Sequence, residues 1–312
     1  MDKLSDSLYR FVDSCNVYVV RSGREAVLID FGCGDVLDKL PEIGVDRVAA
    51  ILITHHHRDQ VQGLPRAVAA GIPIWVPSAE QDLFAHVDEH WQARPVANSY
   101  DNRQDRFSLL EPVPVAGLLG DYSSWTFAGV RFTVLPTPGH TTGSLTLLAD
   151  VDGQHVAFSG DLIAAPGQVW SLAATQWSYN GAEGVAASIA SLISLKGQRA
   201  AMLLPSHGEP MRETALAIDL LIERLWKLLQ DRGENARLFR FLDQPYDAIT
   251  PHLLWNRTSV ATTYVLLSES GKALLIDYGY DFMTGFAAGK GSAPRLPWLY
   301  TLPKTESRFR GE

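Results

Sequence analysis

The residue types best suited to chemistry lie in one short stretch, Thr54 to Gln60, which reads Thr-His-His-His-Arg-Asp-Gln. It follows the apolar run Val48 to Ile53, which has the length and β-branched content of a buried strand. His55 and His57 alternate at the strand end and can aim at one point, and Asp59 follows shortly after. Neutral imidazoles and a carboxylate suit a borderline divalent ion such as zinc. A merely polar loop is the alternative, which three consecutive histidines disfavour.

Three later segments repeat the pattern of an apolar strand that ends beside a potential metal ligand. The run Val130 to Leu135 leads into Pro-Thr-Pro-Gly-His140. The next segment, Val-Ala-Phe-Ser-Gly, ends in Asp161, and Met-Leu-Leu-Pro-Ser ends in His207. A lone histidine or aspartate at a strand end is usually just solvated. Four such ends in one chain indicate a shared metal site.

These segments resemble the metallo-β-lactamase fold hydrolases, especially the glyoxalase-II-like branch. That family carries T-H-x-H-x-D-H, then G-H-T-x-G-S, then G-D and a late His-Gly. The resemblance covers roughly Ser7 to Gly233. The matching stretches are Thr54 to Asp59, Gly139 to Ser144, Gly160-Asp161 and Ser206 to Gly208.

The resemblance implies an α/β fold, a metallo-β-lactamase-type αββα sandwich of two mixed β-sheets flanked by helices. It also implies a metal-dependent hydrolase, in which a hydroxide formed on the ion attacks an ester, thioester, lactone or lactam-type bond. The first ion would be held by His55, His57 and His140. The second would be held by Asp59, Asp161 and His207, and the two carboxylates are also the candidate catalytic residues.

Gln60 is the one departure from the family pattern, because a second-metal histidine stands at that position in the family. An amide oxygen is a poorer zinc ligand than an imidazole. We therefore expect one or two zinc ions with a weak second site, and iron or manganese is compatible with the same donors. His56 or His90 could supply the missing ligand instead. Otherwise strand alternation points His56 away from the metal, and its replacement should do little.

A second histidine pattern, His86-Val-Asp-Glu-His90, matches the H-x-x-E-H motif of inverted zinc peptidases. On the helix expected over Ser78 to Trp91, with Ser78 as N-cap, the two imidazoles would share a face. No third ligand follows at a helical spacing, which favours a solvated face or a pocket rim.

The substrate contacts are predicted from aromatic residues that follow Asp161. In the family this region borders the cleft, so Trp170, Trp177 and Tyr179 are expected to wall the substrate site. Ordinary core aromatics are the alternative.

Two other functions are compatible with the same residues. Histidine-rich sites with a carboxylate also hold iron, and persulfide-oxidising relatives share this motif set, so an iron-dependent sulfur oxidoreductase is one alternative. A degenerate, non-catalytic binding module is the other. The near-complete set of ligands argues against such a module.

The charge composition indicates which class of molecule the protein binds. The formal net charge of −8 is spread along the chain without a basic run, which argues against nucleic acid and leaves a small-molecule substrate. The polar opening residues Met1 to Asp6 do not have the charged-then-apolar pattern of a leader peptide, so none is expected. No stretch is long and apolar enough for a bilayer-spanning segment to be expected. We expect a cytoplasmic protein without membrane contact, in which Cys15 and Cys33 are reduced.

The C-terminal part repeats the beginning of the chain. Thr263 to Gly279 echoes Val17 to Gly32, and both stretches end in Ile-Asp-[Phe/Tyr]-Gly. We predict a catalytic domain at 1–233 and an extension at 234–312 that resembles the first hairpin of a second, incomplete unit. Its strands should add to or lie against the sandwich through Trp255, Trp298 and Tyr300, and a homo-oligomer could form through this extension.

The remaining elements follow from hydrophobic period and turn signals. The expected segments are a hairpin (Asn16 to Val20 with Glu25 to Ile29), a strand (Pro73 to Val76), helices (Asp35 to Leu40, Gln60 to Ala70, Ala182 to Leu195, Met211 to Gln230) and an irregular stretch (Asn98 to Tyr122).

Overall fold

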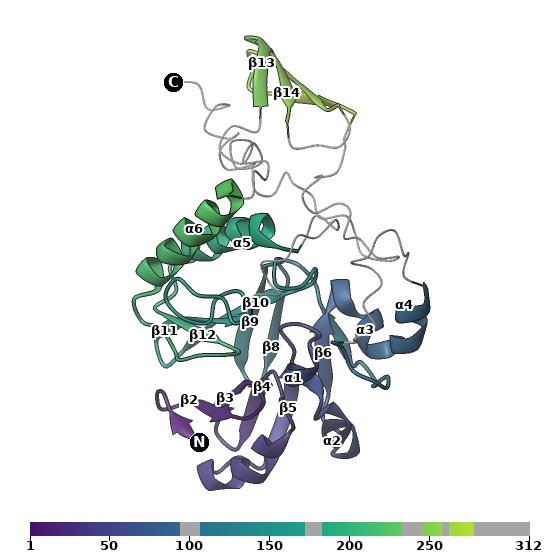
Figure 1. Cartoon of the computed structure of the whole chain (residues 1–312), viewed down its shortest axis with the longest axis vertical. Coiled ribbons are helices and arrows are strands. Elements are labelled where there is room, and N and C mark those ends of the chain that lie inside the picture. Colours follow the sequence, from purple (N-terminus) through teal and green to yellow (C-terminus); the bar gives the residue numbers. More distant parts are fainter. Residues whose placement is uncertain (94–106, 172–182, 232–245, 258–261, 278–312) are drawn as a thin grey trace.

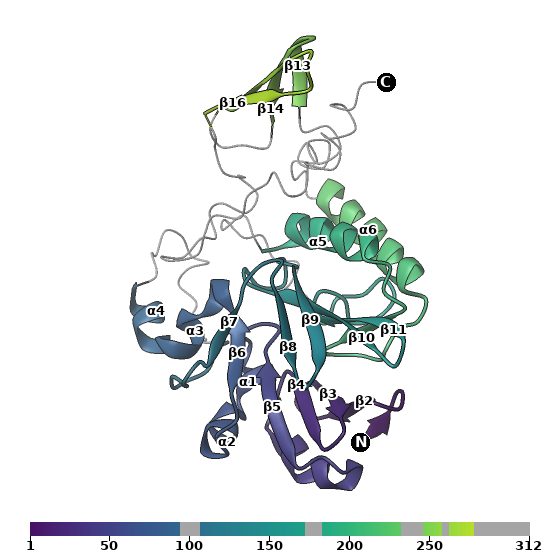
Figure 2. The same ribbon diagram turned by 180° about the vertical axis from the view of Figure 1, so that it is seen from behind.

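The computed structural model describes residues 1–93, 107–171, 183–231, 246–257 and 262–277. Two β-sheets lie face to face in its main body, with helices on both outer sides (Figures 1 and 2). This arrangement is the predicted αββα sandwich of two mixed sheets.

The first sheet has seven strands in sequence order. Its first three pairings are antiparallel and the last three are parallel, so the sheet is mixed. The strands are β1 (Asp2–Lys3), β2 (Leu8–Val12), β3 (Asn16–Ser22), β4 (Glu25–Ile29), β5 (Arg47–Leu52), β6 (Ile74–Pro77) and β7 (Gly117–Leu119).

The second sheet has five strands in the order β12-β11-β10-β9-β8. Only the β11–β12 pair is parallel, and the other pairings are antiparallel. The strands are β8 (Ser124–Phe127), β9 (Val130–Pro136), β10 (Leu145–Val151), β11 (Gln154–Gly160) and β12 (Met202–Pro205).

Side-chain alternation along the strands explains the layers. In β3, Tyr18 and Val20 belong to the cluster between the sheets, whereas Val17 and Val19 belong to the cluster under the N-terminal helices. A third cluster packs the outer face of the second sheet against two long helices. A strand buried on both faces reads as a continuous apolar run, which is why the sequence revealed these strands.

Two segments that were each expected to form one helix are interrupted in the structure. The segment expected as one helix over Gln60 to Ala70 is split before Gly63, where a Cβ would stand 2.2 Å from the Cys33 backbone. The expected helix after Ser78 is broken at His86, which has an extended φ of −136°. The helices are η1 (Asp35–Ile43), α1 (Arg58–Val61), α2 (Leu64–Ala69), η2 (Ser78–Glu80), α3 (Asp82–Ala85), α4 (Val87–Ala93), α5 (Val185–Gly197) and α6 (Thr214–Asp231).

Three smaller expectations can also be compared with the structure. Ser78 is the first residue of η2, and Pro77 rather than Ser78 occupies the N-cap position. The stretch expected to be irregular contains β7 near its end, and its residues 98–106 lie outside the described part. Both cysteines are free thiols, as predicted. Within the described residues, no helix is both long enough and apolar enough to cross a bilayer.

The C-terminal strands form a separate sheet in the order β13-β14-β15-β16. The expectation that they add to the sandwich is therefore wrong, and both views draw them apart from it (Figures 1 and 2). Trp255 is 37% exposed and is covered by Arg257, and Trp298 and Tyr300 lie outside the described residues. The strands are β13 (Tyr246–Thr250), β14 (Leu253–Asn256), β15 (Tyr264–Leu267) and β16 (Ala273–Ile276).

Candidate metal centre

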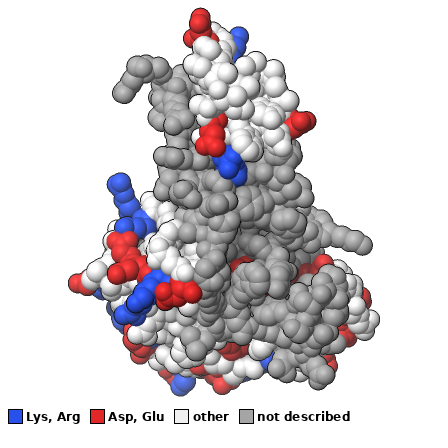
Figure 3. Space-filling model, turned by 45° about the horizontal axis from the view of Figure 1, so that its top comes forward, with Lys and Arg blue, Asp and Glu red and all other residues white. Residues whose placement is uncertain are grey.

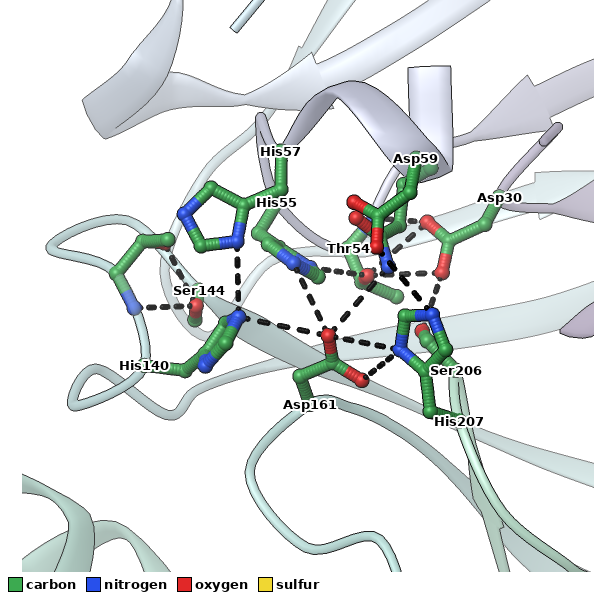
Figure 4. Close-up of polar contacts among 12 residues, drawn as sticks. Asp30, Thr54, His55, His57, Asp59, His140, Ser144, Asp161, Ser206 and His207 are labelled. Atoms are coloured by element: carbon green, nitrogen blue, oxygen red, sulfur yellow. Dashed lines mark hydrogen bonds and ion pairs between the residues drawn. The ribbon is translucent and has the colours of Figure 1, made fainter. Parts of the chain in front are cut away.

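The residues predicted as metal ligands come together at one end of the sandwich (Figure 4). His55 and His57 lie between β5 and α1, and Asp59 is in α1. Loops after strands of the second sheet bring the others. His140 lies between β9 and β10, Asp161 directly follows β11, and His207 follows β12.

Three imidazoles form the tightest group. The ligand atoms of His55, His57 and His140 all lie within 4.8 Å of one another. His140 Nε2 is 2.9 Å from His57 Nδ1. The side chain of His55 is fully buried and that of His140 is 4% exposed. The ring nitrogens of three histidines therefore converge at a point largely shielded from water, and one of the His57–His140 pair donates a proton to the other.

The orientation of His55 is set by a buried carboxylate. The Thr54 hydroxyl has one proton, which it donates to Asp30 at 2.9–3.0 Å. Because His55 Nδ1 lies 3.0 Å from the same hydroxyl oxygen, Nδ1 must carry the proton and donate it. This leaves Nε2 unprotonated and directed into the centre. Asp30 also accepts hydrogen bonds from the Thr54 amide and from Ser206 Oγ, so it braces two of the loops that carry ligands.

Asp161 occupies the middle of the group. Its Oδ2 lies 3.6 Å from His55 Nε2 and 3.4 Å from His140 Nε2. His207 Nδ1 lies 2.8 Å and 3.0 Å from the two carboxylate oxygens. The other ring nitrogen of His207 lies 3.3 Å from Asp59 Oδ2. One carboxylate thus joins the three-histidine group to the pair Asp59 and His207.

Gln60 is fully buried beside the same atoms. Its amide nitrogen lies 3.4 Å from Asp161 Oδ2. Rotating the amide by 180° puts the nitrogen 2.6 Å from Asp59 Oδ1 and 3.2 Å from His55 Nε2, which satisfies both ends of the group. The side chain that departs from the family pattern therefore donates hydrogen bonds to neighbouring ligands.

Burial and neighbouring charges shift the pKa values of the three-histidine group and of His207 in opposite directions. Burial, aided by neighbouring imidazoles, lowers the pKa of His55 and of His140, and it lowers that of His57 to about 3. Burial opposes the charged form of His207 as well, but hydrogen bonds to Asp161 and Asp59 raise its pKa to about 10. The three-histidine group is neutral, which is the form that binds a metal.

The donor set fits a divalent ion. Three imidazole nitrogens within 4.8 Å of one another are the kind of ligands that bind zinc in proteins. His140 Nδ1 is buried and has no hydrogen-bond partner, so the hydrogen bonds of that ring are made by Nε2. Asp59, Asp161 and His207 offer two carboxylates and an imidazole to a neighbouring ion.

The residues predicted to contact substrate differ in their positions. Trp170 stacks on His207 with ring centroids 4.2 Å apart and planes within 2°, and it is 55% exposed. Trp177 and Tyr179 lie outside the described residues. The second histidine pattern does not lie on one helix, because the helix is interrupted at His86 between α3 and α4. His86 pairs with Asp82, and neither His86 nor His90 belongs to the three-histidine group.

Comparison with known proteins agrees with this geometry. The profile of the metallo-beta-lactamase superfamily matches residues 10–207. A hydroxyacylglutathione hydrolase from Albidiferax ferrireducens is 29% identical over 154 residues, which are 48% of this chain and 48% of that relative. The chain therefore spans about half the length of this relative. A beta-lactamase-like protein 2 homolog from Drosophila melanogaster is 25% identical over 273 residues, covering 82% and 83% of the two chains.

A solved structure supports the fold independently. The native FEZ-1 metallo-beta-lactamase from Legionella gormanii superposes with a TM-score of 0.55 at 16% identity, covering 75% of this chain and 97% of that one. The profile match over residues 10–207 establishes that the chain belongs to the metallo-beta-lactamase superfamily.

Proposed function

We propose that this centre binds one or two zinc ions and hydrolyses an ester, thioester, lactone or lactam-type bond of a small molecule. His55, His57 and His140 would hold the first ion, and Asp59, Asp161 and His207 the second. The observation that carries the proposal is the convergence of three neutral imidazoles on a buried point beside Asp161 Oδ2.

The chain's own residues have distinct parts in this scheme. A bound ion supplies Lewis acidity, which polarises a carbonyl and lowers the pKa of water. Asp161 lies between the two ligand groups and keeps them in register. Asp59 is partly exposed, with a side chain 41% accessible, so it can orient the attacking water or move a proton to the leaving group.

The substrate side of the site is supported by Trp170. An exposed indole stacked on His207 gives a flat apolar wall at the entrance to the second ligand group. Since one relative is named a hydroxyacylglutathione hydrolase, a glutathione thioester is the first substrate to test. On the face drawn in Figure 3, the described Lys and Arg side chains lie beside Asp and Glu side chains rather than in a patch of their own, which favours a small substrate over a polyanion.

The second ion should bind more weakly than the first. Gln60 offers an amide where an imidazole would bind zinc better. We expect the isolated protein to carry fewer than two tightly bound metals, and Gln60→His should raise the content toward two. Two equally tight ions in the unaltered protein would contradict this part of the proposal.

One experiment tests the function and separates it from its rivals. Protein purified without added metal is analysed for zinc, iron and manganese, and then assayed on thioesters, lactones, esters and β-lactams. Zinc-dependent turnover of one of these classes is the expected result. Iron with persulfide oxidation would instead identify a sulfur oxidoreductase, and metal without any turnover would identify a binding module.

We also propose that the chain divides into a catalytic domain, 1–233, and an extension, 234–312. Support comes from the β-strand pairings. Tyr18 pairs with Ile29 in β3–β4, and the equivalent Tyr264 pairs with Ile276 in β15–β16. The extension carries exposed apolar side chains on β16, through which a homo-oligomer could form.

A further inference from the structure

A second carboxylate is buried near the centre without belonging to it. Glu80 is the last residue of η2 and only 3% exposed. Its Oε1 accepts hydrogen bonds from the Gly143 amide at 2.9 Å and from the Thr141 hydroxyl at 2.5 Å. His56 Nδ1 lies 3.1 Å from the same oxygen. The carboxylate therefore contacts both the histidine turn and the loop that carries His140.

Each hydroxyl near Thr141 has one proton to donate, which determines the direction of every hydrogen bond there. The Thr141 hydroxyl gives its proton to Glu80, so the hydroxyl of Ser144, 2.7 Å away, must donate to Thr141 Oγ1. Ser144 Oγ in turn accepts from the Thr141 amide at 3.0 Å. Every proton in this network has one acceptor, and the network ends on Glu80.

The loop is also held sterically, on both sides. A Cβ on Gly143 would stand 2.4 Å from Glu80 Cγ, and one on Gly139 would stand 2.7 Å from the Ser188 backbone in α5. Ser191 Oγ in α5 donates to the carbonyl of Pro138 at 2.6 Å. The loop around His140 is therefore pinned between α5 and Glu80.

His56 completes the connection to the other ligands. It lies between His55 and His57, and its ring is directed at Glu80 rather than into the three-histidine group. The sequence pattern predicts little effect from its replacement. The buried contact with Glu80 gives it a different role, because it fixes the turn between the two flanking ligands.

We propose that Glu80 is a positioning residue that joins the His55–His57 turn to the His140 loop and so sets the direction of three imidazoles. This inference rests on the proposed metal site. Glu80 acts on the two loops through Thr141, Gly143 and His56, none of which is a proposed metal ligand. Groups that hydrogen-bond metal ligands change metal affinity by about 10–100-fold, and we expect loss of Glu80 to fall near the lower end.

The test compares metal binding in the full-length protein and three variants. Glu80→Ala removes all three contacts, and Glu80→Gln keeps an oxygen that can accept from Thr141 and Gly143. The matched control is Asp152→Ala, because Asp152 also tethers two segments by hydrogen bonds, to Ser5 and Ser7, at the far end of β10. Zinc affinity is measured by chelator competition, and the visible absorption of the cobalt-loaded protein reports the geometry of the histidine group.

We expect Glu80→Ala to weaken zinc binding by about 10-fold and to alter the cobalt spectrum. Glu80→Gln should recover most of both, and Asp152→Ala should match wild type. If Glu80→Ala does not fold, Thr141→Val takes its place, because it removes one hydroxyl from the network at nearly constant volume. Wild-type affinity and an unchanged spectrum in a folded Glu80→Ala or Thr141→Val protein would overturn the positioning role. Failure of the wild type itself to bind zinc or cobalt would instead refute the proposed metal site.

Discussion

The first four strands and the last four strands of the structure are two versions of one arrangement. In both, consecutive strands pair antiparallel in sequence order. The third and fourth strands share their register, with Val19 opposite Leu28 and Val265 opposite Leu275. Each fourth strand is followed by an aspartate with a positive φ, 57° at Asp30 and 54° at Asp277.

The two sheets differ in what covers them. Leu28 is fully buried, whereas the equivalent Leu275 is 46% exposed. Asp30 accepts three hydrogen-bond donors from the loops of the metal centre, whereas Asp277 is exposed. The four-stranded arrangement is therefore only a scaffold. The proposed metal ligands of the first sheet follow a fifth strand, β5. This strand pairs with β4 and so places the histidine turn beside Asp30.

The largest expected difference is between replacing a histidine of the metal centre and replacing a histidine of the C-terminal sheet. His57→Ala removes one of three converging nitrogens. Losing a group that only hydrogen-bonds a ligand can weaken metal binding by about 100-fold, so losing the ligand itself should lower zinc affinity and the rate of hydrolysis by more than that. His252→Ala, in the turn between β13 and β14, should leave both unchanged. Equal losses in the two variants would mean that the metal site is not where the three imidazoles meet. Metal titration and a rate assay decide the matter.

A smaller effect is expected from equivalent leucines. Leu28→Ala creates a cavity under the N-terminal helices and should lower the free energy of unfolding by about 2–5 kcal/mol. Leu275→Ala, on a half-exposed strand, should cost about 1 kcal/mol or less. Chemical denaturation of both variants measures the difference. Similar losses would show that the C-terminal sheet is buried in solution, for example against a second copy of the chain.

Replacing the equivalent aspartates, Asp30 and Asp277, should change the free energy of unfolding by amounts that differ less than those of the two leucine variants. Asp30→Asn keeps one acceptor oxygen but turns an amide N–H toward donors, which should cost about 1–3 kcal/mol. It should also weaken metal binding, because Thr54 then no longer fixes the His55 tautomer. Asp277→Asn should leave the unfolding midpoint and metal content at wild-type values, as monitored by thermal unfolding and metal analysis. A loss of metal in Asp277→Asn would link the second sheet to the site.

The smallest effect should follow from removing the extension altogether. A chain ending at Gly233 retains every proposed ligand, so zinc content and the rate of hydrolysis should stay within about twofold of the full-length protein, since surface changes away from the site are nearly neutral. Loss of hydrolysis in a folded 1–233 protein would assign the extension to the substrate site.

Much of this centre could be predicted from sequence because its ligands follow buried strands. Each of three apolar runs is closely followed by a proposed ligand: Asp161 comes directly after Gly160, His55 two residues after Ile53 and His140 five residues after Leu135. Strand ends on one side of a sandwich meet in space, so linear order was enough to predict their convergence. The equivalence of the two terminal sheets was likewise visible in the Ile-Asp-[Phe/Tyr]-Gly repeat.

The supporting contacts could not be predicted in this way, because they depend on packing between distant segments. Glu80 reads as an ordinary helical residue, and nothing in its neighbourhood indicates that Thr141 and Gly143 lie against it. The break before Gly63 arises from close contact with the Cys33 backbone. The strands β13 and β14 are only five and four residues long, which is too short for a hydrophobic pattern to predict them.

The most direct test of the proposed metal-dependent hydrolysis is a reconstitution measurement. Protein stripped of metal by a chelator is titrated with zinc while hydrolysis of a glutathione thioester, or of the best substrate found in the panel, is followed. The metal-free protein should be inactive, and the first equivalent of zinc should restore most of the rate, because we propose the three-histidine group as the tighter site. Full hydrolysis by the metal-free protein, or no zinc uptake at all, would contradict the account.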